Sequence, residues 1–124
     1  MMITSKQLLI CCAALLAGTT AHAADENGYP TSDRVLYVQE CMAAHPGHYY
    51  EMVSKCSCAI DSIAAQVPYD DYIHMTTVVN AMTIGGERGG TLRDNESIKP
   101  EIKRYRELNA KAQKGCFIGM EGPK

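Results

Sequence analysis

The chain has 124 residues and a formal net charge of −2, with six cysteines and four histidines. This length allows one domain at most. The near balance of acidic and basic side chains excludes the basic footprint that nucleic-acid binding requires, so we expect no nucleic-acid partner.

Residues 1–23 have the features of a cleavable secretory signal peptide. Lys6 supplies a positive charge, and the apolar run Leu8–Gly18 follows it. Ala21 and Ala23 occupy the small-residue positions of a cleavage site, which predicts cleavage after Ala23 or Ala24. The run is too short for a permanent membrane helix, and no later segment is apolar enough to form one. We therefore expect a soluble protein of the periplasm or a secreted one, with a formal net charge of −3 once Lys6 is removed.

The first part of the exported chain predicts a short loose segment and then a helix. Residues 24–30 are polar and end in a Gly-Tyr-Pro turn, which predicts a loose N-terminus over residues 24–31. Thr31 or Ser32 suits the N-cap of a first helix over Ser32–Ala44. The residues expected on its core face recur at helical spacing: Val35, Val38, Met42 and, beside them, Cys41.

Two further helices are expected on either side of Pro68. The first carries one apolar stripe at i, i+3, i+4 and i+7 spacing: Tyr49, Met52, Val53, Cys56, Ile60, Ile63, Ala64 and Val67. The second has Asp70 and Asp71 in its first turn, where backbone N–H groups favour negative charge. Its expected core face comprises Tyr72, Met75, Thr76, Val79 and Met82. Gly85 and Gly86 are expected to end it.

The stretch Gly85–Glu96 holds four glycines and predicts a long loop. Long loops in compact domains often carry function, and guanidinium groups suit carboxylate or phosphate ligands. We expect a partner-binding surface made of these residues: Glu87, Arg88, Arg93 and Asp94. A flexible connector is the alternative. The lysine–serine pattern of a P-loop is absent and a helix precedes the stretch, which argues against a nucleotide site.

A fourth helix is expected from Ser97, its N-cap, to Gly115, with Pro100 tolerated in the first turn. Its apolar face comprises Ile102, Tyr105, Leu108 and Ala112. Four helices and few convincing strands predict an all-α fold. We expect a small irregular four-helix bundle over residues 32–119, linked by two disulfides, with a tail at 120–124.

Four cysteines remain after signal removal, and an even number in a small exported domain implies disulfides. Successive helical residues differ by about 100° in direction, so Cys56 and Cys58 point to nearly opposite sides of one helix and need different partners. Two pairings are open: Cys41–Cys56 with Cys58–Cys116, or Cys41–Cys58 with Cys56–Cys116. The first is preferred because Cys41 and Cys56 both border apolar faces of neighbouring helices. A redox-active Cys-x-Cys is the functional alternative, although such pairs usually lie at a helix N-terminus.

Met42, His45, His48 and Met52 lie close together around the turn between the first two helices. Thioether and imidazole groups suit copper, so a copper-binding or copper-delivery protein is one alternative. The competing interpretation is structural, because both methionines lie on expected core faces, where methionine fills gaps. We favour no metal and no other cofactor. No nucleophile–base–acid set is visible, so we expect no catalysis.

The stretch "CSCAIDSIAAQVPYDDY" resembles small exported proteobacterial proteins in which a Cys-x-Cys helix precedes a helix that opens in paired acids. The similarity extends over Cys41–Tyr72, and those proteins are mostly without assigned activity. The stretch "GGERGGTLRDNE" is similar to proteins encoded near periplasmic quinoprotein alcohol-oxidation systems, which implies an accessory protein of a quinoprotein dehydrogenase. We expect a non-enzymatic periplasmic protein that binds another protein. The alternatives are copper delivery, the quinoprotein accessory role and thiol–disulfide exchange.

Overall fold

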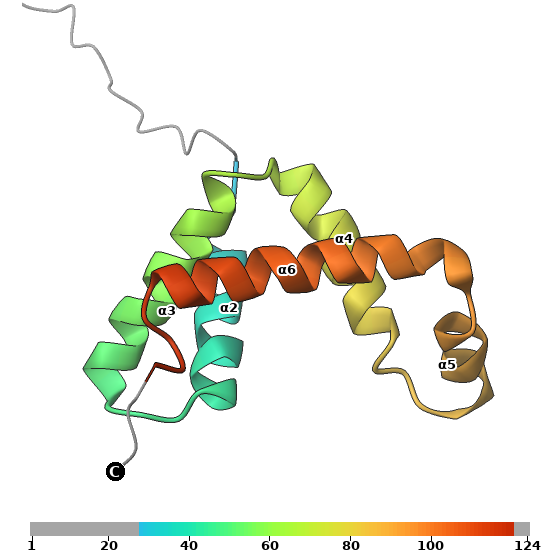
Figure 1. Ribbon diagram of the computed structural model, residues 1–124, viewed down its shortest axis with the longest axis horizontal. Coiled ribbons are helices and arrows are strands. Elements are labelled where there is room, and N and C mark those ends of the chain that lie inside the picture. Colours follow the sequence, from blue (N-terminus) through green and yellow to red (C-terminus); the bar gives the residue numbers. More distant parts are fainter. Residues whose placement is uncertain (1–27, 121–124) are drawn as a thin grey trace, which may run out of the picture.

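The computed structural model describes residues 28–120, and all regular secondary structure in this part is helical (Figure 1). Its elements are α2 (Thr31–Ala44), α3 (Tyr49–Ala64), α4 (Tyr69–Ala81), α5 (Gly86–Arg93), the 3-10 turn η2 (Glu96–Ile98) and α6 (Lys99–Gly115). The all-α prediction is confirmed, with four helices near their expected positions and α5 in addition. None of these helices is both long and apolar enough to cross a membrane. The expected signal peptide, residues 1–23, lies outside the described residues.

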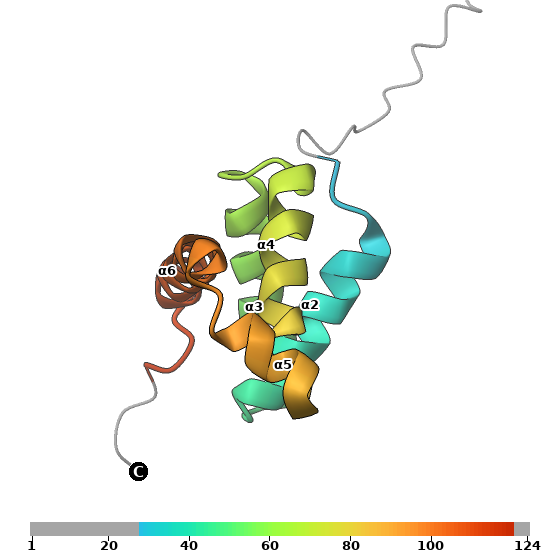
Figure 2. The same cartoon turned by 90° about the vertical axis from the view of Figure 1, so that its right-hand side faces the viewer.

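The helices are arranged around α3 and α4, which diverge from the short connection at residues 65–68 (Figure 1). Helix α6 lies across both of them and contacts both. Helix α2 packs on the side of α3 that is opposite α6, as Figure 2 shows. Helix α5 lies at the end of α6 that is remote from α3. One end of α6 therefore belongs to the core around α3, and the other end meets α4 and α5.

Helix α3 supplies the centre of the core because α2 covers one of its sides and α6 the other. Its most deeply buried residues are Cys56, Ala59, Ile60 and Ile63, each at most 1% exposed. Burying one such aliphatic side chain contributes about 1.5–3 kcal/mol. The apolar stripe expected here is thus confirmed in its central part. Tyr49, at the start of the expected stripe, is instead 65% exposed.

The apolar face expected for α2 is confirmed in part, since Cys41 is buried and Val38 and Met42 pack against the core. Tyr37 is buried, whereas Val35 is 48% exposed. Val38 and Met42 line the groove between α2 and α3 and are only partly buried. The Tyr37 hydroxyl donates a hydrogen bond of 2.5 Å to Oδ1 of Asn109 in α6. This hydrogen bond joins residues that are distant in the sequence, and it keeps the side of α2 that carries Tyr37 facing the core.

The segment before α2 is held by Tyr29. Its ring packs against the rings of Tyr69 and Tyr72, with centroids 5.3 and 5.0 Å away. Its hydroxyl donates to the carbonyl oxygen of Val67 at 3.0 Å. The expected loose terminus over residues 24–31 therefore does not extend to Tyr29, because aromatic burial and a satisfied hydroxyl offset the entropy lost on ordering it. Residues 24–27 lie outside the described part.

The prediction of a long loop over Gly85–Glu96 is wrong, since Gly86–Arg93 forms α5. The physical reason lies at Gly89, where an added Cβ atom would stand 1.7 Å from the carbonyl oxygen of Ile84. The helix packs this closely on the residues after α4 only with glycine at that position. The Arg93 guanidinium also donates to the Ile84 carbonyl oxygen, at 3.1 Å. Gly89 thus permits close packing, and its presence does not signal a flexible loop.

Two of the N-cap residues in the structure differ from those that the sequence predicts. Helix α2 begins after Pro30, whose carbonyl oxygen accepts hydrogen bonds from the backbone N–H groups of Asp33 and Arg34. Before α6, the Asn95 side chain accepts a hydrogen bond of 3.0 Å from the Ser97 N–H and so caps η2. Asparagine is as good a cap as serine, so sequence alone does not decide between two neighbouring candidates.

Candidate functional site

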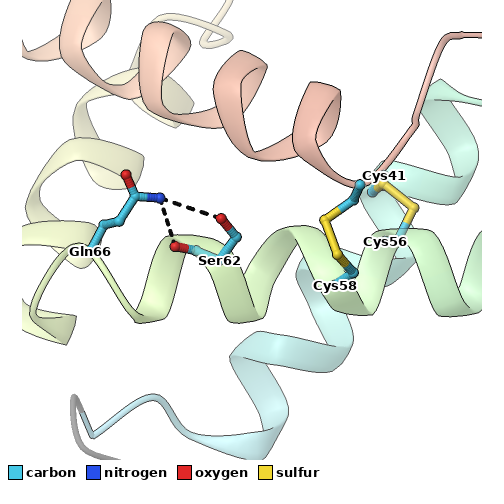
Figure 3. The surroundings of a disulfide bond; sticks show 6 residues. Cys41, Cys56, Cys58, Ser62 and Gln66 are labelled. Atoms are coloured by element: carbon cyan, nitrogen blue, oxygen red, sulfur yellow. Dashed lines mark hydrogen bonds between the residues drawn. A yellow bond between two sulfur atoms is a disulfide. The ribbon is translucent and has the colours of Figure 1, made fainter.

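Two disulfides fasten α3 to its neighbours (Figure 3). Cys56 is bonded to Cys41 of α2, and Cys58 is bonded to Cys116, the residue after α6. The preferred pairing is confirmed. Because Cys56 and Cys58 point to different sides of α3, each bridge serves a different helix. Together they tie the two outer helices to the central one.

The surroundings of these bridges favour a structural role. All four cysteines within residues 28–120 are paired, and Cys56 has no exposed surface. Cys58 is exposed, but it lies within α3 and not at a helix N-terminus, where a thiolate would be stabilised. Thiol–disulfide exchange remains a prediction.

The four residues of the alternative copper site do not line a common cavity. His45 and Met52 line a small cavity of about 190 Å³ at the end of α2. Met42 lines the separate groove between α2 and α3, and His48 is exposed ahead of α3. In the part of the chain that the structure describes, no three or more His, Cys, Asp or Glu residues form a group that could hold a metal ion. Copper binding that uses the thioethers remains a prediction.

The expected partner-binding residues lie on helix α5 or directly after it, and not on a long loop. They are Glu87, Arg88, Arg93 and Asp94, and all four are exposed. The Arg93 guanidinium donates a hydrogen bond to the carbonyl oxygen of Ile84, in the segment between α4 and α5. It also borders a cavity that the other three do not line. Arg93 is thus the member of the expected surface that contributes to this cavity.

This cavity, here called the basic cavity, has a volume of about 370 Å³ and lies between α5, α6 and the end of α4. It is lined by Met82, Arg93, Lys99, Ile102, Lys103, Arg106 and Glu107. Ile102 is buried and Met82 is partly buried, and they supply the apolar part of the lining, here called the floor. Four of the seven lining residues are cationic and one is anionic. The site therefore combines an apolar surface with a positive rim.

The rim cations differ in how firmly they are held. Lys99 contacts the Glu96 carboxylate, and the Lys103 ammonium lies 3.8 Å from the Glu107 carboxylate. Exposed pairs of this kind contribute at most about 1 kcal/mol. A carboxylate of a ligand can therefore replace Glu96 or Glu107 as the partner of the lysine at little cost in free energy. Arg93 is different, because a backbone carbonyl of the fold orients its guanidinium.

Part of the basic cavity has a visible signal in the sequence. Lys99, Lys103 and Arg106 follow i, i+4, i+7 spacing, which places them on one face of a helix. The same helix also carries an apolar stripe that includes Ile102, and the basic pattern overlaps that stripe. The contribution of Arg93 has no such signal, because it depends on how α5 packs against the end of α4.

The fold and this site define a small all-α protein with two disulfides and a cation-rimmed apolar cavity. Comparisons with protein-family models, with curated proteins and with solved structures find no match. The function is therefore inferred from the geometry of the chain.

Proposed function

We propose that this is an exported, non-enzymatic protein of the periplasm or the extracellular space that binds another protein. Its binding site is the basic cavity, and the part of the partner that enters it is an acidic amphipathic segment. One observation carries the proposal: four cationic side chains line one cavity together with an apolar floor, and one of them, Arg93, donates a hydrogen bond to a backbone carbonyl oxygen.

The distribution of polar groups favours such a segment over a small inorganic anion. A small anion that leaves water needs several converging hydrogen-bond donors to replace its hydration. Here the four cationic side chains come from separate positions on α5 and α6, and Ile102 and Met82 add apolar surface to the same lining. An amphipathic segment fits both features, because its apolar side chains cover the floor and its carboxylates reach the rim.

The size of the cavity indicates how much of the segment is buried. A volume of about 370 Å³ is at the small end of the range of about 300–1,000 Å³ for ligand pockets. It therefore takes one or two apolar side chains, and the charged contacts lie outside on the rim. Exposed charges are screened within about 8–10 Å at moderate salt. We expect binding that weakens as ionic strength rises.

Two observations support export. Disulfides persist in oxidising compartments, and the fold contains two that fasten its central helix. Residues 1–23 carry the signal-peptide pattern in the sequence.

Affinity capture with two matched charge reversals tests this function. Arg106→Glu and Lys111→Glu both alter an exposed residue of α6 and change the net charge equally, but only Arg106 lines the basic cavity. The purified variants and the unaltered protein are used to capture proteins from a periplasmic extract. We expect a partner that the unaltered protein and Lys111→Glu retain and that Arg106→Glu loses.

Two results would contradict the proposal. If all three forms retain the same partner, the basic cavity is not its binding site. If the unaltered protein retains no partner above the background of an unrelated acidic protein, the protein-binding function itself is wrong. Circular dichroism of both variants establishes that the helices remain intact.

A further inference from the structure

A second cavity, of about 310 Å³, lies between α2 and α4 and is bordered by one residue of α6. It is here called the tyrosine cavity, because Tyr37, Tyr72 and Tyr105 line it. Two carboxylates, Asp33 and Glu40, also line it, and no lysine, arginine or histidine does. It shares no lining residue with the basic cavity. Its aromatic and anionic lining is therefore opposite in character to that of the basic cavity.

The tyrosine rings are held by the packing of the helices. The Tyr72 and Tyr105 centroids lie 6.3 Å apart with the planes tilted by 56°, and the Tyr37 hydroxyl is bonded to Asn109. Burial is the main cause that raises the pKa of Tyr37, to about 12, and it also raises the pKa of Tyr105. The phenols stay protonated at neutral pH, and their rings keep the negative π faces that attract cations.

The two carboxylates give the lining of the cavity a negative charge. Neither Asp33 nor Glu40 takes part in an ion pair with the lysines, arginines or histidines of residues 28–120. Asp33 accepts hydrogen bonds from the Ser32 and Tyr69 hydroxyls, which hold the carboxylate in place. Burial is the largest cause that raises the pKa of Tyr105, and the negative charge of Glu40 is the next. The electrostatic field of Glu40 therefore extends to the Tyr105 ring.

The spacing of the carboxylates argues against an inorganic cation. Asp33 and Glu40 are seven residues apart on α2, which corresponds to about 10 Å along a helix axis. Within residues 28–120 neither carboxylate belongs to a group of three or more His, Cys, Asp or Glu residues that could hold a metal ion. An organic cation has apolar surface for the rings and spreads its charge over a longer span.

We infer that the tyrosine cavity binds a small organic ammonium ion, which contacts the rings of Tyr37, Tyr72 and Tyr105 and is attracted by Asp33 and Glu40. Aromatic walls with nearby carboxylates are the usual means of recognising such ions. The volume of about 310 Å³ is sufficient for a ligand of that class. This site is independent of partner binding at the basic cavity.

The test compares ligands that have the same shape but differ in charge. Choline and its uncharged carbon isostere, dimethylbutanol, are titrated into the purified protein while NMR records the tyrosine ring signals. We expect saturable shifts with choline and at least about tenfold weaker binding of the isostere. Butane diamine forms a third arm: tighter binding than choline assigns the site to primary diammonium ions, and weaker binding assigns it to quaternary ones.

Variants connect the binding to the named residues. Glu40→Gln removes one carboxylate of the cavity, and Glu87→Gln on α5 is the matched control at an exposed position. We expect choline affinity to fall roughly fivefold in the first and to stay unchanged in the second. Tyr105→Leu should lose binding, whereas Tyr105→Phe keeps the aromatic face and should retain it.

Three results would overturn the inference. The first is the absence of saturable binding by choline and by the diamine. The second is equal affinity for choline and dimethylbutanol, which would show that charge is not recognised. The third is unchanged choline affinity in both Glu40→Gln and Tyr105→Leu. Circular dichroism confirms that each variant has kept its helices before it is titrated.

Discussion

The carbonyl oxygen of Ile84 lies 1.7 Å from the point that a Cβ atom on Gly89 would occupy. Helix α5 therefore packs against the residues after α4 through its backbone. The same carbonyl oxygen accepts a hydrogen bond from Arg93, four residues further along α5. This contact brings one of the four cations to the edge of the basic cavity.

Gly89→Ala should detach α5 or lower the free energy of unfolding, because the new methyl group meets backbone that has little freedom to move. We expect a loss of about 1–3 kcal/mol, the usual range for overpacking. Gly90→Ala is the control, because its Cβ atom would meet only the Arg93 guanidinium, at 4.0 Å. Alanine within a helix should leave stability equal or raise it by about 0.5–1 kcal/mol.

Urea unfolding and amide hydrogen exchange over α5 measure both effects. Equal stability and equal protection of α5 in the two variants would show that the Gly89 contact with Ile84 does not hold the helix in place.

Graded reduction should open the Cys58–Cys116 bridge before the Cys41–Cys56 bridge. Cys58 is exposed, whereas Cys56 has no exposed surface, and a reducing thiolate must reach a sulfur atom to attack it. The bridge that opens first closes a loop of 58 residues, so its loss should lower stability by about 4 kcal/mol in the chain-entropy account.

Alkylation with peptide mapping at increasing concentrations of reductant gives the order. Earlier labelling of Cys41 and Cys56 would contradict it. Opening of Cys58–Cys116 under very mild reduction, as in exchange enzymes, would instead favour the thiol–disulfide alternative.

Stability should fall in alkaline solution, because burial raises the pKa of Tyr29 and Tyr37 to about 12. The unfolded chain releases these phenolic protons from about pH 10, whereas the folded chain retains them until about pH 12. The free energy of unfolding is therefore unaffected below pH 10 and decreases between pH 10 and pH 12. Each tyrosine contributes at most about 1.4 kcal/mol per pH unit to this slope.

Urea unfolding of Tyr37→Phe across this range checks the prediction. The variant loses the Asn109 hydrogen bond, which lowers stability at every pH by about 1 kcal/mol, but its alkaline slope should be shallower. Tyr50→Phe, at a residue that is 78% exposed, should keep the original slope. Identical slopes in all three proteins would mean that Tyr37 does not link stability to pH.

The features that follow from local pattern were predictable from the sequence. The central stripe of α3 follows from helical spacing, and Pro68 marks the boundary before α4. The opposite directions of Cys56 and Cys58 predict that each has a different partner, and the apolar faces that the cysteines border favour the observed pairing over the other open one. These features need only the geometry of one helix and the alternation of apolar and polar residues.

The remaining features depend on contacts between residues that are distant in sequence. Tyr29 is ordered by the Val67 carbonyl oxygen, and Tyr37 is turned inward by Asn109. Helix α5 was missed because its glycines suggest flexibility until the close approach of Ile84 is known. The basic cavity was missed for the same reason, since α5 must fold before it forms.

The most direct test of the basic cavity is a fluorescence anisotropy titration with a labelled amphipathic helical peptide of Leu and Glu. A peptide with Gln in place of Glu is the ligand control, and Arg106→Glu with Lys111→Glu are the protein controls. We predict salt-sensitive binding of the Glu peptide that is weakened about tenfold by Arg106→Glu and less than about twofold by Lys111→Glu. Equal binding of the two peptides, or equal weakening in the two variants, would contradict the account.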